Sequence, residues 1–378
     1  MKNILIIASS YPSKGDPYSS FIESLVEEMA NQGVSVTVIA RQSITWHMLN
    51  RVPFAPLFSS KVKNGNFIRI YRPLGFTDVG RLGPFARWFN RITIRMTARK
   101  LPKPDAVYAH FWQNGVYVID YVRKNKLPFI VATGEDKIIA DKISAKDKEW
   151  LKEHVQHVIC VSSKNKQESI ETGLAKEENC VVLPNAYNST EFYIENGNEM
   201  RKHLGLSRND FTIAFCGRWN ERKGIFRLDA ALKKLNNPHI KAIYIGNLMD
   251  NSKVEPDYTQ IVFKGQLPHN EIVHYLNAAD VFVLPSEAEG CPNSVIEAMA
   301  CGLPVISSDL PFNYDILNSN NSILLDPNDV NMIAEKIDLL YQDRQLCRKL
   351  ASGAINSAQS MRIDKRVERI LKLLYKKS

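Results

Sequence analysis

Short apolar runs alternate along the chain with longer stretches in which apolar residues recur at helical spacing. Short runs of this kind predict buried strands, and strands separated by helices predict a parallel, doubly wound sheet. In the first half, the predicted strands cover residues 4–8, 36–39, 106–108, 129–131, 158–161 and 181–183. Ser20 and Glu23 fit a capping box at the start of a predicted helix over residues 21–31, and Gly33 follows its last turn.

A polar stretch over residues 188–210 interrupts this alternation, which then restarts. The second series of predicted strands covers residues 212–216, 240–245, 261–263, 281–284 and 304–306. Predicted helices cover residues 225–234, 270–277 and 293–300, and residues 329–374 are helical in pattern. A chain of 378 residues also exceeds what one hydrophobic core usually serves. We therefore predict two Rossmann-like α/β domains, at 1–188 and 189–358, that face an interdomain cleft, with a last helix over 359–378 returning to the first domain.

Apolar runs and cysteines bear on where the protein works. No apolar run approaches the roughly 20 residues of a membrane-spanning helix. The first run, over residues 4–8, is shorter than the roughly 7–15 apolar residues of a signal peptide. The six cysteines are scattered without a Cys-x-x-Cys motif, which argues against a disulfide framework or a zinc site. We expect a reducing, cytoplasmic location.

The net charge of +9 is confined to the first half of the chain. Residues 1–185 hold 26 Lys and Arg against 17 Asp and Glu, whereas residues 186–378 hold 23 of each. Within residues 41–103, 13 basic residues accompany nine aromatic residues and a single acid, Asp78. A basic protein could bind nucleic acid, but no recognition module for it is visible and the second half is neutral. We therefore expect no nucleic-acid partner.

A predicted amphipathic helix lies within residues 81–103. Its apolar positions are Phe85, Trp88, Phe89, Ile92 and Met96, and a row of arginines follows Arg87, Arg91, Arg95 and Arg99. One interpretation is a helix that packs its apolar face on the sheet and leaves its charged face in solvent. The other is a surface that meets anionic lipid headgroups, which the basic excess of residues 41–103 and the apolar residues of 46–58 favour. On the second interpretation, the first domain docks on the inner face of the cell membrane.

Two segments that directly follow predicted strands carry candidate chemistry, at the strand ends where doubly wound sheets bind ligands. In one of them, a strand ends at Pro285, a loop with Glu289 follows, and a helix then begins. Backbone N–H groups of Asn293 and Ser294 at this helix start would form an anion site. Glu289 and Glu297 would lie on either side of it, and a carboxylate can accept hydrogen bonds from two sugar hydroxyls. The structural alternative is a pair of carboxylates stabilised by the helix dipole.

The other segment, residues 215–224, leads from a strand through Gly217 to two cations, Arg218 and Lys223. Both could face one diphosphate and stabilise the charge that develops as it leaves. The structural alternative is a solvated loop. No Asp-x-Asp motif occurs in the chain. We therefore expect the two cations, rather than a metal ion, to neutralise the diphosphate.

Glu289 and Glu297 lie inside the pattern Pro-Ser-x-x-Glu-Gly-x-Pro-Asn-x-x-x-Glu-Ala-Met-Ala-x-Gly-x-Pro-Val. Together with Gly217-Arg218 and Lys223-Gly224, this pattern resembles the retaining glycosyltransferases of family four, over nearly the whole chain. The resemblance implies the GT-B fold and transfer of a hexose-type sugar from a UDP- or GDP-sugar. It implies a saccharide or lipid-linked acceptor in cell-surface polysaccharide or glycolipid synthesis. It implies no metal ion and no cofactor besides the nucleotide-sugar substrate.

The resemblance also implies roles for individual residues. Glu289 would contact hydroxyls of the transferred sugar and Glu297 the donor ribose, while Arg218 and Lys223 would hold the diphosphate. His110 matches a histidine near the sugar, although a hydrogen-bonded structural histidine is the alternative. The further donor-side positions are Gly15 in the loop over residues 11–20, Gly217, Gly290, Cys291, Asn293 and Ser294, and Asn185 matches the asparagine that closes the first domain.

Two features depart from the family pattern. The loop over residues 11–20 lacks a Gly-Gly pair, and the family's His-Gly-x-Asp appears as Thr133-Gly134-Glu135-Asp136. Glu135 or Asp136 could instead bind an acceptor hydroxyl. The mechanism that the resemblance implies is front-face displacement with retention, in which the leaving phosphate deprotonates the acceptor. A nucleotide-sugar epimerase on a related fold is the main alternative, but it would need an acid/base pair that is not evident.

Overall fold

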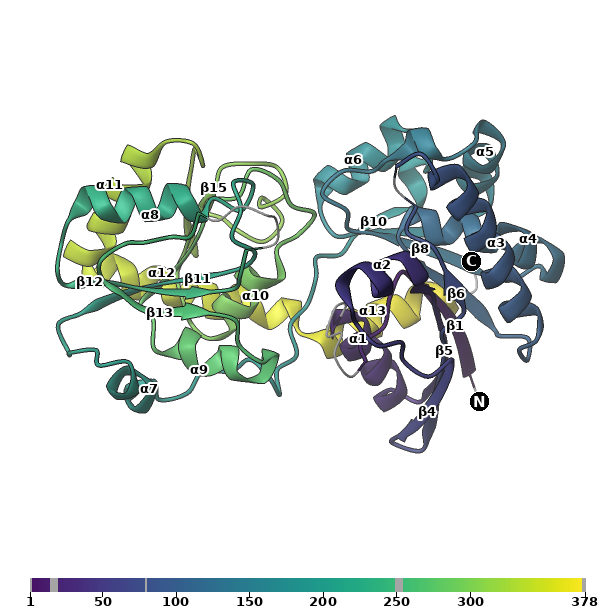
Figure 1. Ribbon diagram of the computed structural model, residues 1–378, viewed down its shortest axis with the longest axis horizontal. Helices are drawn as coiled ribbons and strands as arrows, with labels where there is room; N and C mark the ends of the chain where they lie inside the picture. The colour runs from purple at the N-terminus through teal and green to yellow at the C-terminus, as the bar shows by residue number, and fades with distance from the viewer. Residues whose placement is uncertain (1, 14–19, 79, 249–253, 376–378) are drawn as a thin grey trace. The chain divides into compact units, whose positions relative to one another are not determined.

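The structure of the protein, a computed structural model, describes residues 2–13, 20–78, 80–248 and 254–375, and it comprises two compact units (Figure 1). Unit 1 consists of Met1–Val161, Asn165–Leu183 and Ile363–Ser378, and unit 2 of Ser162–Lys164 and Pro184–Arg362. The chain finally passes into unit 2 after residue 183 and returns to unit 1 at residue 363. The sequence pattern suggested domain boundaries after residues 188 and 358, which differ from these positions by a few residues.

Unit 1 is built on a sheet with the strand order β10-β9-β8-β7-β1-β2-β5-β4, parallel except for β4, which runs antiparallel to β5. The strands are β1 (Lys2–Ala8), β2 (Val34–Ala40), β4 (Phe58–Lys63), β5 (Asn66–Tyr71), β7 (Ala106–His110), β8 (Phe129–Thr133), β9 (His157–Cys160) and β10 (Cys180–Val182). A two-stranded sheet joins β3 (Gln42–Ser43) to β6 (Leu74–Gly75). Alternate residues of β1 face opposite cores, Leu5 and Ile7 on one side and Ile4 and Ile6 on the other.

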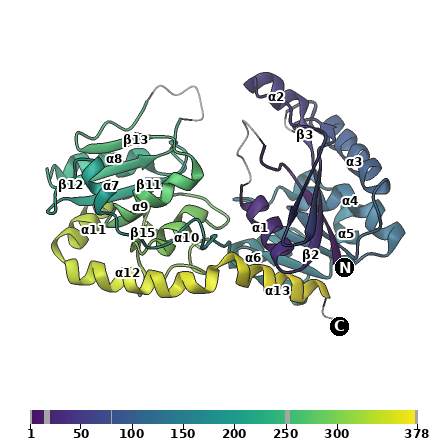
Figure 2. The same ribbon diagram turned by 90° about the horizontal axis from the view of Figure 1, so that it is seen from below.

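Helices cover both faces of this sheet, which explains why its central strands are apolar throughout. The helices are α1 (Ser20–Asn31), α2 (Ile44–Asn50), α3 (Gly83–Arg99), α4 (Trp112–Asn125), η1 (Ala140–Lys142), α5 (Ala145–His154), α6 (Ser163–Glu171), η2 (Glu177–Asn179) and α13 (Ile363–Tyr375). Side chains of α3, α4 and α5 fill the core on one face, and those of α1 and α13 fill it on the other. α13 lies beside α1 (Figure 2), and its Val367, Ile370 and Leu374 are buried there.

The basic segment over residues 41–103 contains a hairpin that the sequence analysis did not predict. Strands β4 and β5 are joined at Asn64 and Gly65, which both have positive φ angles of 49° and 76°. An Asn-Gly turn of this kind is a strong hairpin signal, so the sequence did carry the information. On β4, Lys61 forms ion pairs with Glu23 and Glu27 of α1. Part of the basic excess is therefore neutralised within unit 1.

Helix α3 is present where it was predicted, but its faces differ from the sheet-packing interpretation. The buried positions are Gly83, Ala86, Asn90, Ile94 and Ala98, not the predicted apolar row. Phe85 and Trp88 of that row are 51% and 59% exposed. The arginine row is not wholly a solvated face either, because Arg91 bonds to Asp147 of α5 at 2.9 Å and Arg95 to Asp120 of α4 at 3.2 Å. On the buried stripe, Ile94 and Ala98 join the core of this face, and the Asn90 side chain bonds to the backbone of Phe76.

Unit 2 is built on a parallel sheet with the strand order β13-β12-β11-β14-β15-β16. Its strands are β11 (Phe211–Cys216), β12 (Ile240–Ile245), β13 (Ile261–Gly265), β14 (Val281–Leu284), β15 (Val305–Ser308) and β16 (Ser322–Leu325). Its helices are α7 (Asn198–His203), α8 (Ile225–Leu235), η3 (His269–Glu271), α9 (Ile272–Asn277), α10 (Asn293–Ala300), α11 (Val330–Gln342), α12 (Arg344–Ala358) and η4 (Gln359–Met361). The prediction of two Rossmann-like domains is confirmed, and β16 is an additional edge strand.

Candidate active site

In unit 2, the strand order reverses at β11, which lies between β12 and β14. Doubly wound sheets bind ligands beside the carboxyl ends of the strands at such a reversal. The loop after β11 and the loop after β14 both begin there, and they are the two segments that carry the motifs. The topology of unit 2 therefore brings the motifs together, although about 70 residues separate them in the chain.

The two loops touch through their backbones, and a glycine makes this contact possible. Gly224 has a φ of 77°, and a Cβ atom on it would lie 2.1 Å from the carbonyl oxygen of Pro285. Any other residue would therefore force the loops apart. The Glu287 amide donates to the Arg222 carbonyl at 2.8 Å, and the Arg222 guanidinium donates to the Ala288 carbonyl at 3.0 Å. These bonds fix the residues that follow.

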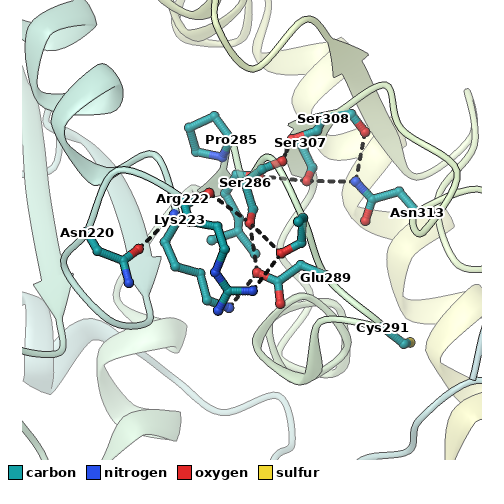
Figure 3. Close-up of polar contacts among 12 residues, drawn as sticks. Asn220, Arg222, Lys223, Pro285, Ser286, Glu289, Cys291, Ser307, Ser308 and Asn313 are labelled. Atoms are coloured by element: carbon teal, nitrogen blue, oxygen red, sulfur yellow. Dashed lines mark hydrogen bonds and ion pairs between the residues drawn. The ribbon is translucent and has the colours of Figure 1, made fainter. Parts of the chain in front are cut away.

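Lys223 and Glu289 form an ion pair in which Lys223 Nζ lies 2.5 Å from Glu289 Oε1 (Figure 3). Their side chains are 15% and 10% exposed, so the pair is largely shielded from water. The Ser286 hydroxyl donates to the same Glu289 oxygen at 2.8 Å, and the Asn220 side chain accepts a bond from the Lys223 amide at 2.9 Å. The sequence analysis treated these residues as parts of separate motifs, and the structure makes them one charge pair.

Gly217 and Arg218 open the loop after β11. The carbonyl oxygen of Gly217 lies 1.9 Å from where a Cβ of Gly246 would stand, so the ends of β11 and β12 also meet at a glycine. Arg218 is exposed. Of the two predicted cations, Lys223 is the one that the structure places against Glu289.

Helix α10 begins where the sequence predicted, with Pro292 as its N-cap residue and no side-chain cap. Val295 and Ile296 are the first residues whose amides donate to Pro292, so the amides of Asn293 and Ser294 precede the first intrahelical bond. The Cys291 carbonyl accepts a bond from the Asn185 side chain at 3.0 Å. Gly290 and Cys291 are buried in the turn between Glu289 and α10, and Cys291 is 7% exposed.

Glu297 lies one turn inside α10, and its carboxylate faces a histidine that the sequence analysis did not consider. His269 Nε2 lies 3.7 Å from Glu297 Oε1, and His269 Nδ1 lies 3.1 Å from Glu191 Oε2. The neighbouring carboxylates of Glu191 and Glu297 raise the pKa of His269 to about 10. Because its ordinary value is 6.5, His269 is an imidazolium at neutral pH.

His110 is the last residue of β7 in unit 1, at the point where the strand order reverses at β1. It is buried against the rings of Phe21 and Phe111, and neither of its ring nitrogens has a hydrogen-bond partner among the described residues. Burial, and then the charge of Arg366, lowers the pKa of His110 to about 3. Its imidazole is therefore neutral at pH 7. The predicted site residue Gly15 lies outside the described residues.

The loop over residues 133–136 follows β8 in the same unit. The Glu135 carboxylate accepts bonds from the Thr133 hydroxyl at 2.6 Å, the Gly134 amide at 2.9 Å and the Trp112 amide at 3.4 Å. Burial raises the pKa of this carboxyl group, and the three donors oppose that shift. Glu135 thus anchors the start of α4, whereas Asp136 is exposed.

The described residues contain no cluster of three or more His, Cys, Asp or Glu side chains placed to hold a metal ion. Over the same residues, no helix combines the length and the apolar character that crossing a membrane requires.

Comparison with protein families decides which class of protein carries this site. A model described as "Glycosyltransferase Family 4" matches residues 19–191, and one described as "Glycosyl transferases group 1" matches residues 196–357. The chain belongs to the glycosyltransferases. Its two Rossmann-like units are those of the GT-B fold, as the motif resemblance implied, and the group 1 match contains both motif loops.

Relatives of this glycosyltransferase cover most of its length. It is 29% identical over 359 residues to the putative teichuronic acid biosynthesis glycosyltransferase TuaC of Bacillus subtilis, with 91% of this chain and 90% of the relative covered. It is 27% identical to the Escherichia coli UDP-Gal:alpha-D-GlcNAc-diphosphoundecaprenol alpha-1,3-galactosyltransferase, covering 70% and 75%.

Solved structures share the fold of this glycosyltransferase over its whole length. Sucrose-phosphate synthase from Thermosynechococcus elongatus superposes with a TM-score of 0.77 at 19% identity, covering 99% of this chain and 98% of its own. Anabaena Alr3699/HepE, in complex with UDP and glucose, superposes with a TM-score of 0.72 at 19% identity, covering 99% of each chain.

Proposed function

We propose that this glycosyltransferase moves a hexose-type sugar, with retention, from a UDP- or GDP-sugar to a saccharide or lipid-linked acceptor in cell-surface polysaccharide or glycolipid synthesis. The buried Lys223–Glu289 pair, next to the start of α10, is the observation that carries this proposal. The Anabaena structure, which holds UDP and glucose, supports a nucleotide-sugar donor. The names of the Bacillus and Escherichia coli relatives support an acceptor of the polysaccharide or lipid-linked class.

The ion pair suggests how the site accepts the donor without exposing an unpaired charge. When the donor binds, a diphosphate oxygen takes the place of Glu289 beside Lys223, and hydroxyls of the transferred sugar bond to Glu289. Each partner thus exchanges one bond for another, which avoids the penalty of a buried unpaired charge. Arg218 and the amides of Asn293 and Ser294 complete the diphosphate site, with Gly217, Gly290 and Cys291 in the turns that shape it. Glu297 takes the ribose.

Transfer proceeds by front-face displacement. The bond from the anomeric carbon to the phosphate oxygen breaks while the acceptor oxygen bonds to the same carbon from the same face, and the acceptor proton passes to the departing phosphate. Negative charge grows on the diphosphate, where Lys223 and Arg218 stabilise it without a metal ion. His110, neutral at pH 7, offers a hydrogen bond to a sugar hydroxyl rather than a proton to the leaving group. No separate catalytic base is needed.

The acceptor side has its own cavity in unit 1, of about 330 Å³, at the carboxyl ends of β1, β2, β7 and β8. Its polar lining comes from Ser9, Arg41, Asp78, Asn114, Asp136 and Lys142, and Phe111 and Ile138 add apolar surface. Acids, bases and amides in balance beside apolar surface suit a saccharide. The Asn114 side chain donates to the Ser9 hydroxyl at 3.0 Å, which leaves the Ser9 proton for an acceptor oxygen.

We propose further that unit 1 docks on an anionic membrane surface through residues 41–103, from the cytoplasmic side. The exposed apolar residues Met48 and Leu49 of α2 and Leu82, Phe85 and Trp88 at α3 support this. Basic residues near an anionic surface contribute about 1 kcal/mol each, and those paired with acids contribute less. The docking surface therefore excludes the paired Lys61, Arg91 and Arg95.

Vesicle sedimentation tests this docking. We expect the protein to bind vesicles with anionic lipid more tightly than neutral vesicles, and Trp88→Ala to weaken that binding several-fold. Tyr314→Ala, which removes an exposed aromatic residue of unit 2, is the matched control and should have no effect. Equal binding to both kinds of vesicle would contradict membrane docking and leave the transfer reaction untouched.

The donor assignment is tested with a panel of nucleotide sugars, by thermal stabilisation of the protein and by donor hydrolysis. At least one UDP- or GDP-sugar should raise the melting temperature and be hydrolysed slowly. Lys223→Met should abolish hydrolysis of that donor. A protein that responds to no nucleotide sugar would contradict the proposed function.

A further inference from the structure

Three segments of unit 2 meet at His269. Glu191 lies in the turn after the chain enters unit 2, His269 begins η3 after β13, and Glu297 lies on α10. His269 Nδ1 lies 3.1 Å from Glu191 Oε2, and His269 Nε2 lies 3.7 Å from Glu297 Oε1. One imidazole thus contacts a carboxylate with each of its nitrogens.

Glu191, at one end of the Glu191–His269–Glu297 array, is itself fixed. The Asn188 side chain donates to Glu191 Oε1 at 2.5 Å, and the Glu191 amide donates to the Asn188 carbonyl at 3.0 Å. Phe192 packs edge-on against the His269 ring, with the ring centroids 5.2 Å apart. Glu191 is therefore a held anchor rather than a mobile surface acid, and the ring between the two carboxylates has a defined orientation.

This arrangement has a chemical consequence for Glu297. Two carboxylates that share one imidazole favour its doubly protonated form, because both ring nitrogens must donate. The contact is made to Oε1 of Glu297, so the position of this carboxylate depends on His269.

We propose that His269 is a positioning residue of the donor site, which holds the Glu297 carboxylate ready to accept the two ribose hydroxyls of the nucleotide, with Glu191 as its anchor. The inference rests on the proposed function, since Glu297 is the ribose contact there. It adds a residue that lies outside both sequence motifs and acts only through Glu297.

Nucleotides with and without ribose hydroxyls test this role. Calorimetry would compare binding of UDP with that of 2′,3′-dideoxy-UDP, or of the GDP pair if GDP binds tighter, to the wild-type protein and to His269→Ala. We expect His269→Ala to weaken UDP binding about tenfold and dideoxy-UDP binding less than about twofold, as for loss of one charge-assisted bond. The proposal would be overturned if His269→Ala weakened the binding of both nucleotides equally, or weakened the binding of neither.

The matched control is His274→Ala. His274 lies on the neighbouring helix α9, and its Nδ1 bonds to Glu195 at 2.6 Å. The His274 side chain is about as exposed as that of His269. Its Nδ1 pairs with Glu195 rather than with Glu297, so His274→Ala should bind both nucleotides as the wild-type protein does. If His269→Ala does not fold, His269→Gln takes its place, because Gln keeps one donor and should lose only part of the UDP preference.

Glu297→Ala separates this proposal from the donor assignment. If Glu297→Ala binds UDP and dideoxy-UDP equally and His269→Ala keeps the full wild-type preference for UDP, the positioning role is contradicted. If Glu297→Ala still prefers UDP, the ribose role of Glu297 is wrong and the proposal falls with it. If both variants lose the preference and the double variant loses no more than Glu297→Ala alone, His269 acts through Glu297.

Discussion

The two units reverse their strand order in the same way, yet their functional residues at the reversal differ. In unit 2, Lys223 and Glu289 neutralise each other and further bonds hold both. In unit 1, His110 is buried with no partner for either ring nitrogen among the described residues. Both reversals arise in the same way from parallel strands, yet the residues in their loops differ. Topology alone therefore does not decide what a site binds.

The difference between the paired charges of unit 2 and the unpaired imidazole of unit 1 indicates how each site is prepared for its ligand. A charged pair can be opened by a ligand that carries charge and hydroxyls of its own, such as a nucleotide sugar. An unpaired neutral imidazole in an apolar setting gains most from one hydrogen bond to a neutral group. We therefore expect unit 2 to bind the charged part of the ligand and unit 1 to add a neutral contact.

The largest effect is expected for Lys223→Met in unit 2. Loss of the cation that faces the leaving diphosphate should lower kcat for transfer about 10³-fold. The same change leaves the Glu289 carboxylate buried and unpaired, so the free energy of unfolding should fall by about 3 kcal/mol. Steady-state kinetics and urea unfolding would measure both effects. Lys372→Met removes the exposed ion pair with Glu368 on α13 and should change neither by much.

Glu289→Ala should lower transfer about 10²-fold, because two hydrogen bonds from sugar hydroxyls to a charged group are lost. Binding of the nucleoside diphosphate without its sugar should persist, since Lys223 and α10 remain. Kinetic assays and calorimetry with UDP or GDP would separate the two. Equal loss of transfer and of nucleoside diphosphate binding would contradict a sugar-contact role.

His110→Phe should act in the opposite sense on stability. The change removes two buried nitrogens that lack partners, so the free energy of unfolding should rise by about 1 kcal/mol, while transfer falls about tenfold. Asn90→Leu is the control, because the Asn90 side chain is buried but bonded to both backbone groups of Phe76. That variant should be less stable. A destabilised His110→Phe would show that the histidine is structural.

The smallest expected effect concerns pH and the His269 array. Since folding raises the pKa of His269 from 6.5 to about 10, its contribution to stability is complete below about pH 6.5. The contribution is lost as pH rises through 10. The difference in unfolding free energy between the wild type and His269→Gln should therefore shrink between pH 7 and pH 10. A difference that stays constant over that range would mean that the charge is not what stabilises the array.

Local patterns were sufficient to predict most of the sheets and one helix to the residue. The helix over 293–300 was predicted with the bounds of α10, because a proline and a glycine flank it and its apolar periodicity is clear. The loops after β11 and β14 were also predicted to carry the chemistry, and the structure brings them together. These features depend on neighbours within a few residues, and therefore the sequence alone can predict them.

Features that depend on distant partners were missed. The pairing of Lys223 with Glu289 requires the two loops to meet, and the spacing within either motif does not encode that meeting. His269 stands alone in the sequence, and its role depends on Glu191 and Glu297 in other segments. For α3 the sequence left two interpretations open, and its larger apolar side chains do not form the buried stripe, which consists of Gly83, Ala86, Asn90, Ile94 and Ala98.

The helix α13 has a consequence for biosynthesis. Val367, Ile370 and Leu374 belong to the same core as β1 and α1, so residues from opposite ends of the sequence must meet before that core closes. Pro184–Arg362, by contrast, supplies nearly all of unit 2 and emerges from the ribosome as one continuous stretch. We expect unit 2 to fold during synthesis and unit 1 to finish only afterwards. A nascent chain stalled before residue 363 would hold a complete second unit beside an unfinished first one.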